Sequence, residues 1–211
     1  MQGKPSGKRI VIVGLGNPGR AYSLHRHNLG FHVVDELAAQ GGGSWSTNRE
    51  KTQICEVEIE NQRVVLAKPQ TYMNLSGKAV APLLQRENAD PARLVAVHDD
   101  LDIALGRVRI KVGGGDGGHK GIRSIADSLR FRDFVRVRLG VGRPPEGTPA
   151  EEFVLTAFGP EEQATAKALA TAGAQAVRLI VALGVEEAQH MVHSGRFTQN
   201  SAKLEHRSGS P

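Results

Sequence analysis

The sequence predicts an α/β fold: a single domain with a mixed, twisted β-sheet flanked by helices, and a candidate catalytic cleft at one edge of the sheet. Short β-branched runs alternate with segments of helical apolar spacing, which is typical of sheets with parallel strands. A hairpin-like pair of runs interrupts the alternation, so the sheet is expected to be mixed. The length of 211 residues fits one domain.

Apolar periodicity and turn residues place the elements along the chain. The predicted strands cover residues 8–14, 52–60, 62–68, 93–99, 106–112 and 134–141. The predicted helices cover residues 29–40, 74–87, 119–130, 160–183 and 185–193, with a further helix containing Phe153.

The first strand is a short β-branched run, as expected of a buried strand. The helix after it has apolar residues at Leu29, Val33 and Leu37 and ends at three consecutive glycines. Two alternating runs on either side of Asn61 predict a hairpin. The next helix is interrupted by Pro82.

The fourth strand is apolar along its length and ends at Asp99. The two strands after it alternate polar and apolar side chains, so half-exposed strands are expected. Residues 113–118, which read GGGDGG, are predicted to form a loop between the first of these strands and the helix from residue 119. Residues 143–149 form a longer Pro/Gly-rich loop, which is either a mobile lid or an ordinary connector.

The bulk sequence points to a soluble, cytoplasmic protein. Residues 1–7 are expected to be a flexible N-terminus, residues 8–193 the folded domain and residues 194–211 a disordered polar tail. No apolar run approaches the roughly 20 residues of a membrane span, and no signal peptide is apparent. The single cysteine, Cys55, excludes a disulfide framework and a cysteine-based zinc cluster.

Positive charge is concentrated in one segment. Residues 107–143 hold ten Lys or Arg residues against three Asp, whereas the whole chain carries a formal charge of +5. A local surplus of this size suits a polyanionic partner, or else a solvated basic face.

Three glycines between residues 14 and 19 follow the first strand with the G-x-G-x-x-G spacing of a dinucleotide-binding turn. Such a turn needs a helix that begins within the motif, but Pro18 lacks an amide N–H and helical spacing starts only later. The acidic ribose contact is also missing, because Asp35 and Glu36 lie inside the predicted helix. No dinucleotide cofactor is therefore expected.

Polar residues follow the predicted strands and would gather at one sheet edge if the strands run parallel. His27 is the preferred general base, and Asp99 is a candidate to orient it. The run HDDLD offers little to a metal ion, because Asp99 and Asp100 face opposite ways on a strand. Residues 113–118 could cradle a phosphate but lack the Gly-Lys-Ser/Thr ending of an NTPase loop. The residues alone leave a hydrolase and a polyanion binder open.

Four motifs together resemble the bacterial peptidyl-tRNA hydrolase family. They are VGLGNPGRAY with RHNLGF, KPQTYMNLSGKAV, VHDDLD with GRVRIKVGGGDGGHKG, and FVRVRLGVGRP with FVL, and they occur in the family's order. The resemblance implies hydrolysis of the ester bond between peptide and tRNA by a cytoplasmic monomer, without metal or cofactor. The implied partner is the acceptor end of peptidyl-tRNA, with its 3′ ester and 5′ phosphate.

The resemblance also assigns roles by position within those motifs. It implies that His27 is the catalytic histidine and Asp99 the aspartate that pairs with it. It places the clamp for the tRNA 5′ phosphate on Lys111 and Arg138, which both lie in the basic segment. The substrate-binding positions that it implies are Asn17, Tyr22, Met73, Asn74, His119 and Lys120.

Lys120 departs from the family pattern, which commonly has GGHNG where this chain has GGHKG. An amide donates and accepts hydrogen bonds, whereas an ammonium only donates. Lys120 is therefore expected to reach solvent, a phosphate or Asp116, and activity is expected to persist with altered handling of the peptide.

Two other classes of function remain at this point. A non-catalytic RNA-binding protein on the same fold would not need the intact set of His27, Asp99, Asn17 and Asn74. A cofactor-binding oxidoreductase would need an acidic ribose contact, for which the sequence has no candidate.

Overall fold

The computed structural model describes residues 9–49 and 51–195. The strands are β1 (Ile10–Gly14), β2 (Ser46–Thr47), β3 (Thr52–Ile59), β4 (Gln62–Pro69), β5 (Leu94–Asp100), β6 (Val108–Val112) and β7 (Val135–Gly140). The α-helices are α1 (Leu29–Gln40), α2 (Ser76–Arg86), α3 (Lys120–Leu129), α4 (Ala150–Val154), α5 (Gln163–Leu183) and α6 (Val185–His193). The 3-10 helices are η1 (Arg20–Tyr22), η2 (Arg26–Asn28), η3 (Met73–Leu75) and η4 (Pro91–Arg93).

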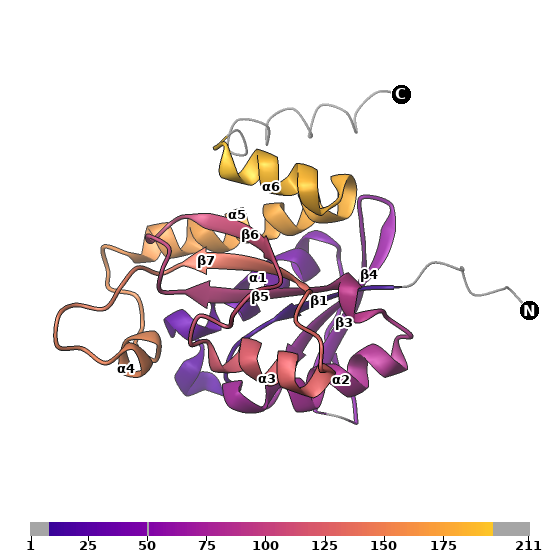
Figure 1. The fold of residues 1–211 in the computed structure, drawn as a ribbon, viewed down its shortest axis with the longest axis horizontal. Helices are drawn as coiled ribbons and strands as arrows, with labels where there is room; N and C mark the ends of the chain where they lie inside the picture. Colours follow the sequence, from indigo (N-terminus) through magenta and orange to yellow (C-terminus); the bar gives the residue numbers. More distant parts are fainter. Residues whose placement is uncertain (1–8, 50, 196–211) are drawn as a thin grey trace, which may run out of the picture.

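The strands form one seven-stranded sheet in the order β2-β3-β4-β1-β5-β7-β6 (Figure 1). The neighbours β4, β1, β5 and β7 are parallel, whereas β2, β3 and β6 pair antiparallel with their neighbours. The predicted mixed sheet in a single α/β domain is therefore confirmed. Because parallel strands end at the same edge, the segments that follow β1, β4 and β5 come together there.

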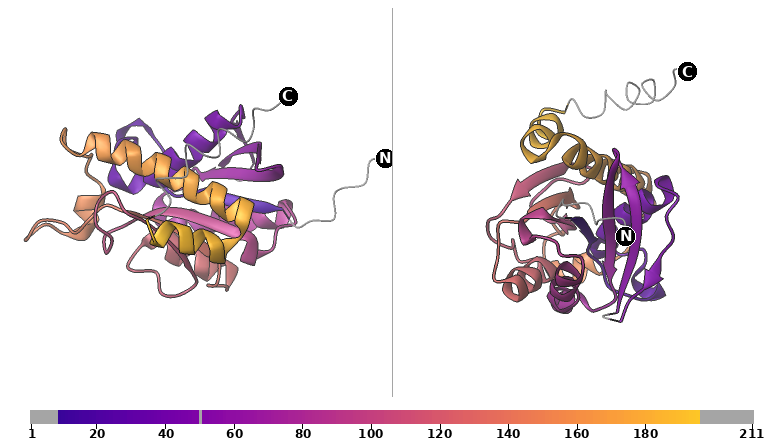
Figure 2. Two further views of the ribbon diagram at one scale, coloured as in Figure 1. Left: turned by 90° about the horizontal axis from the view of Figure 1, so that it is seen from above. Right: turned by 90° about the vertical axis from the view of Figure 1, so that its right-hand side faces the viewer.

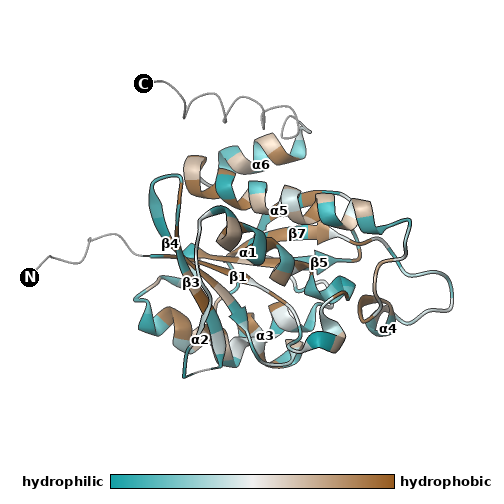
Figure 3. Ribbon diagram, turned by 180° about the vertical axis from the view of Figure 1, so that it is seen from behind, coloured by the Kyte–Doolittle hydropathy of each residue, from teal (hydrophilic) through white to brown (hydrophobic). Residues whose placement is uncertain are grey.

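Helices cover both faces of the sheet. In Figure 1, α5 and α6 lie above the strands and α2 and α3 below them, and the two turned views in Figure 2 show the same layers. Alternate residues of β1 serve the two faces: Ile12 packs in the cluster with α1 and α5, and Val11 and Val13 in the cluster with α2 and α3. Figure 3 shows the largely apolar central strands between these helices.

Helix α5 corrects one expectation about the sequence. It has 21 residues, and an 18-residue stretch within it has a mean hydropathy of 1.3, so its length and composition would allow it to cross a membrane. Half of that stretch is buried inside the fold, and Leu169, Val177 and Ile180 belong to the core cluster on the sheet. The helix is thus a core element of the domain.

The predicted elements recur with shifted ends. The loop before α1 contains η1 and η2, the predicted helix at 74–87 is split into η3 and α2, and the short strand β2 was not expected. These departures are single turns or short pairings that leave little periodicity in a sequence. Residues 1–8 and 196–211, which include the predicted flexible N-terminus and most of the predicted tail, lie outside the described residues.

Glycines allow η2 and α1 to lie directly against the strands. A Cβ atom on Gly30 would lie 2.3 Å from the Val97 carbonyl oxygen and 2.4 Å from the Leu15 nitrogen. A Cβ atom on Gly14 would lie 2.1 Å from the Gly30 carbonyl oxygen. Gly19 has a φ of 107° and turns the chain. The glycine motif thus serves close packing and a turn, and α1 begins well after it.

Candidate active site

A cleft with a volume of about 530 Å³ opens where β1 and β5 end. Eight of the predicted site residues line it: Asn17, Tyr22, His27, Met73, Asn74, Asp99, His119 and Lys120. Lys111 and Arg138, the predicted phosphate clamp, are not among the described residues that line the cleft.

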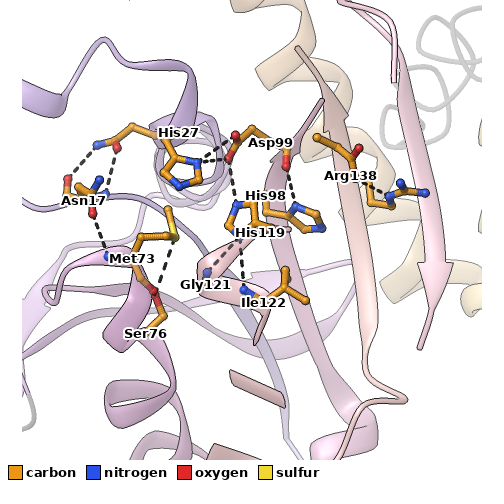
Figure 4. Close-up of polar contacts among 12 residues, drawn as sticks. Asn17, His27, Met73, Ser76, His98, Asp99, His119, Gly121, Ile122 and Arg138 are labelled. Carbon is orange, nitrogen blue, oxygen red and sulfur yellow. Dashed lines mark hydrogen bonds and ion pairs between the residues drawn. The ribbon is translucent and has the colours of Figure 1, made fainter. Parts of the chain in front are cut away.

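The centre of the cleft is a hydrogen-bonded pair between His27 and Asp99 (Figure 4). The His27 Nδ1 atom lies 2.8 Å from one carboxylate oxygen of Asp99 and 3.0 Å from the other. Burial by itself raises the pKa of the Asp99 carboxyl, but the neighbouring imidazoles of His27 and His119 outweigh burial and hold this pKa well below its usual range. An ionised carboxylate only accepts, so Nδ1 carries the proton and Nε2 keeps a lone pair.

His119 holds Asp99 from the other side. It is the N-cap of α3, and its Nδ1 atom accepts hydrogen bonds from the backbone amides of Gly121, at 3.2 Å, and Ile122, at 3.3 Å. The ring proton must therefore sit on Nε2, which donates to the Asp99 Oδ1 atom at 3.1 Å. Both ring nitrogens of His119 are thus occupied by protein groups, and the side chain is hydrogen-bonded to Asp99.

The same tautomer decides whether this cluster fits a metal ion. Ligand atoms of His27, Asp99 and His119 lie within 4.8 Å of one another, which is a spacing that a metal could use. A metal needs a lone pair on the His119 Nε2 atom, and the proton would then have to move to Nδ1, where two backbone amides already point. The three residues therefore fit a hydrogen-bond network and not a metal site.

His98 lies behind His119 and was not singled out from the sequence, although it precedes Asp99 in the HDDLD run. Its Nδ1 atom donates to the Asp99 carbonyl oxygen at 2.7 Å, and its ring meets that of His119 edge to face at 4.7 Å. Burial, with the nearby His119, lowers the pKa of His98 to about 3, so the ring is neutral. A neutral ring adds no positive charge beside the His27–Asp99 pair.

Asn17 faces the cleft with a defined polarity. Its side-chain oxygen accepts the Met73 amide at 2.8 Å, while its backbone exchanges hydrogen bonds with the Asn28 side chain at 3.0 and 2.9 Å. Within the described part of the chain, the Asn17 Nδ2 group has no hydrogen-bond partner. Asn17 therefore presents a donor to any ligand in the cleft.

The residues that line the rest of the cleft were predicted only in part from the sequence motifs. Met73 and Asn74 both belong to η3, where Met73 is buried and Asn74 is exposed. Tyr72, the residue before η3, is also exposed. Val154, the last residue of α4, and Leu155 after it also line the cleft and were not predicted. Tyr72 was also missed as a lining residue, although it lies inside the KPQTYMNLSGKAV motif.

Lys120 reaches across the mouth of the cleft. Its Nζ atom lies 2.8 Å from a carboxylate oxygen of Glu151, in the first turn of α4, and both side chains are largely exposed. The hydrogen bond and charge of Lys120 lower the pKa of Glu151. Of the expected partners, Asp116 is instead paired with Arg123 at 3.1 Å. The ion pair links the start of α3 to α4.

The two predicted clamp residues lie on the β6–β7 pair. Arg109 is opposite Arg138 and Lys111 opposite Arg136, so four cations share one face of these strands. Arg136 is buried and donates to carbonyl oxygens of residues 114 and 115, which holds the glycine-rich loop. Arg138 donates to Asp100 at 2.7 Å. Lys111 is exposed.

The sequence of the chain matches one known protein family. A family model described as peptidyl-tRNA hydrolase matches residues 11–202. The chain is 45% identical over 186 residues to a peptidyl-tRNA hydrolase from Mycobacterium marinum, covering 88% of this chain and 97% of the relative. A relative of the same name from Mycobacterium tuberculosis is 43% identical over 186 residues, with the same coverage of both chains.

Solved structures show the same likeness in three dimensions. A crystal structure of peptidyl-tRNA hydrolase from Acinetobacter baumannii superposes with a TM-score of 0.80 at 33% identity, covering 90% of this chain and 97% of that chain. Together with the sequence relatives, this result supports a hydrolase over a non-catalytic RNA-binding protein or an oxidoreductase.

Proposed function

The chain belongs to the peptidyl-tRNA hydrolase family and hydrolyses peptidyl-tRNA, and from that premise we propose that His27 is its general base and Asp99 the carboxylate that orients it. The observation that carries this proposal is the contact between the His27 Nδ1 atom and both oxygens of Asp99, at 2.8 and 3.0 Å. That contact leaves the Nε2 lone pair as the only base site on the ring.

The reaction then follows general-base hydrolysis of an ester. The His27 Nε2 atom takes a proton from a water molecule, whose oxygen attacks the ester carbonyl. The imidazolium that forms is stabilised by the Asp99 carboxylate. When the tetrahedral intermediate collapses, the ester C–O bond breaks and the ribose 3′ oxygen leaves with the proton that His27 returns. The products are a free peptide and a free tRNA.

Amide donors at the cleft are suited to the carbonyl oxygens of the substrate. Asn17 offers its Nδ2 group because its own oxygen is held by the Met73 amide. Asn74, exposed on η3, is our candidate donor to the tetrahedral oxyanion, and loss of such a donor costs about 3–4 kcal/mol. We assign Met73 to an apolar wall and Tyr22 to a stacking surface. Recognition of backbone groups would allow many peptide sequences.

The cations of the β6–β7 pair are proposed to bind the acceptor end of the tRNA, including its 5′ phosphate. Lys111 is exposed, and Asp100 holds the Arg138 guanidinium in a fixed orientation. Removal of one phosphate contact should weaken binding and lower the salt slope of log Kd by about 1. An Arg138→Ala variant with unchanged affinity and salt slope would refute this assignment. We propose that the enzyme acts as a cytoplasmic monomer without a metal.

Turnover of peptidyl-tRNA by a His27→Ala variant tests the proposed base. The matched control is His190→Ala, which removes an exposed histidine on α6. The proposal predicts loss of nearly all turnover in the first variant and wild-type turnover in the second. Near-normal turnover by the His27→Ala variant would overturn the proposed mechanism.

A further inference from the structure

Arg26 is a buried charged residue directly before the proposed base. It is the first residue of η2, which carries His27, and only 5% of it is exposed. It is not among the described residues that line the cleft, so it has no direct access to a substrate there. A buried guanidinium is costly unless it is paired and hydrogen-bonded, so its contacts indicate what it holds.

The hydrogen bonds of the Arg26 side chain all go to the segment that follows α4. Its guanidinium donates to the Thr156 hydroxyl at 2.9 Å and to the Ala157 carbonyl oxygen at 2.5 Å, and it forms an ion pair with Glu162. Its backbone amide donates to the Thr156 carbonyl oxygen at 3.0 Å. His25 forms a β-bridge with Ala157. The strip from His25 to Arg26 is thereby bonded to residues 156–162.

Two aromatic rings complete the environment of the guanidinium. Its central carbon lies 4.3 Å from the centre of the Phe153 ring and 4.7 Å from that of Phe158. Cations over aromatic faces are stabilised most when they are desolvated, as here. Phe153 belongs to α4, whose next residue, Val154, lines the cleft together with Leu155.

We propose that Arg26 is a positioning residue of the reaction, which sets His27 and the α4 wall of the cleft relative to one another. The inference rests on the proposed role of His27 as general base. The Arg26 side chain donates hydrogen bonds to the segment after α4 and lies over the Phe153 ring of α4. Arg26 is also the residue directly before the proposed base, His27. In Figure 1, α4 lies beyond the end of the central strands, away from the helices that pack on them. Its attachment through Arg26 is therefore a main link to the site.

Lysine cannot replace this residue. An ammonium is a compact charge with no planar surface, so it cannot stack between two rings while donating to a hydroxyl, a carbonyl and a carboxylate. Arg26→Lys keeps the charge and loses the geometry. Because a small displacement of a catalytic group can cost about 100-fold in rate, kcat is expected to fall by about that factor. KM is expected to rise as well, because the α4 wall that Arg26 holds carries Val154 and Leu155 of the cleft lining.

The experiment measures kcat and KM of Arg26→Lys, together with the NMR signal of the His27 Nδ1–H proton in histidine-labelled protein. The control is Arg178→Lys, which alters an Arg–Glu ion pair between α5 and Glu60 away from the cleft. We expect a lower kcat and a shifted His27 signal in Arg26→Lys, and neither change in the control. If Arg26→Lys does not fold, Glu162→Gln replaces it, with the same direction expected for both readouts.

Two results would overturn the inference. One is wild-type kcat with an unchanged His27 signal. The other is a fall in kcat that matches the loss of folded protein while the His27 signal stays unchanged, which would make Arg26 merely structural. Failure of the proposed function is separate, since it would appear as turnover by the His27→Ala variant.

Discussion

Asp99→Asn is the most informative single substitution in the cleft, because the amide has nearly the same shape as the carboxylate. The carboxylate of Asp99 accepts two ring N–H groups: His27 lies 2.8 and 3.0 Å from its two oxygens, and His119 lies 3.1 Å from the first of them. An amide oxygen can take the shared position. The amide NH₂ then lies about where the second oxygen was, 3.0 Å from the His27 Nδ1 atom, with donor facing donor.

His27 can relieve that conflict by moving its proton to Nε2, which removes the lone pair that takes the proton from water. The same change of tautomer in a serine protease lowers kcat by about 10⁴. We expect a similar loss here, which corresponds to about 5.5 kcal/mol in the activation free energy. KM should be nearly unchanged because Asp99 is 2% exposed.

The assay is release of peptide from peptidyl-tRNA under single-turnover conditions, with Asp90→Asn as the matched control, because Asp90 caps η4 and is not among the described residues that line the cleft. The control should match the wild type. A rate for Asp99→Asn within tenfold of the wild type would refute the tautomer argument.

Three further outcomes follow from the same contacts. Because burial lowers the pKa of His98 to about 3 from 6.5, the unfolded chain takes up a proton below about pH 6.5 that the folded chain does not. The free energy of unfolding in urea should therefore fall by about 1.4 kcal/mol per pH unit from about pH 6 to pH 4 on account of His98, and His98→Asn should flatten that slope. Gly30→Ala places a Cβ atom 2.3 Å from the Val97 carbonyl oxygen and should lower the free energy of unfolding by about 1–3 kcal/mol; an unchanged urea midpoint would contradict the close packing. Dialysis against a chelator should leave turnover unchanged, since the His119 tautomer does not fit a metal, and restoration of lost activity by zinc would contradict this.

The strands and long helices were predictable because burial leaves a strong periodic pattern. The β3–β4 hairpin around Asn61 and the helix α6 follow directly from alternation and apolar spacing. The 3-10 helix η2 was not predictable, because three residues give no period, yet it carries His27. Its position depends on contact between Gly30 and the backbone of other strands, which is a long-range property.

The site was predictable to the extent that its residues lie in motifs. Asn17 and His27 follow β1 and Asp99 lies near the end of β5, and the parallel pairing of these two strands brings them together. The polarity of Asn17 and the tautomer of His119 depend on single backbone amides, at Met73 and in α3, that a one-dimensional pattern does not record. A sequence pattern likewise does not record which oppositely charged side chains form ion pairs.

The ion-pair partner of Lys120 could not be predicted from the sequence. The sequence indicated solvent, a phosphate or Asp116, and the structure pairs Lys120 with Glu151 in the short helix α4. An exposed pair of this kind leaves no signal in spacing, because the two residues are far apart in the chain and either could face solvent.

The central claim is that His27 and Asp99 act as one unit, and a double-mutant comparison of kcat tests it most directly. Single-turnover rates would be measured for His27→Ala, Asp99→Asn and the combined variant. If Asp99 acts only through His27, the combined variant should be no slower than His27→Ala alone. A combined rate reduced by the product of the two separate losses would show that the residues act independently and would contradict the mechanism.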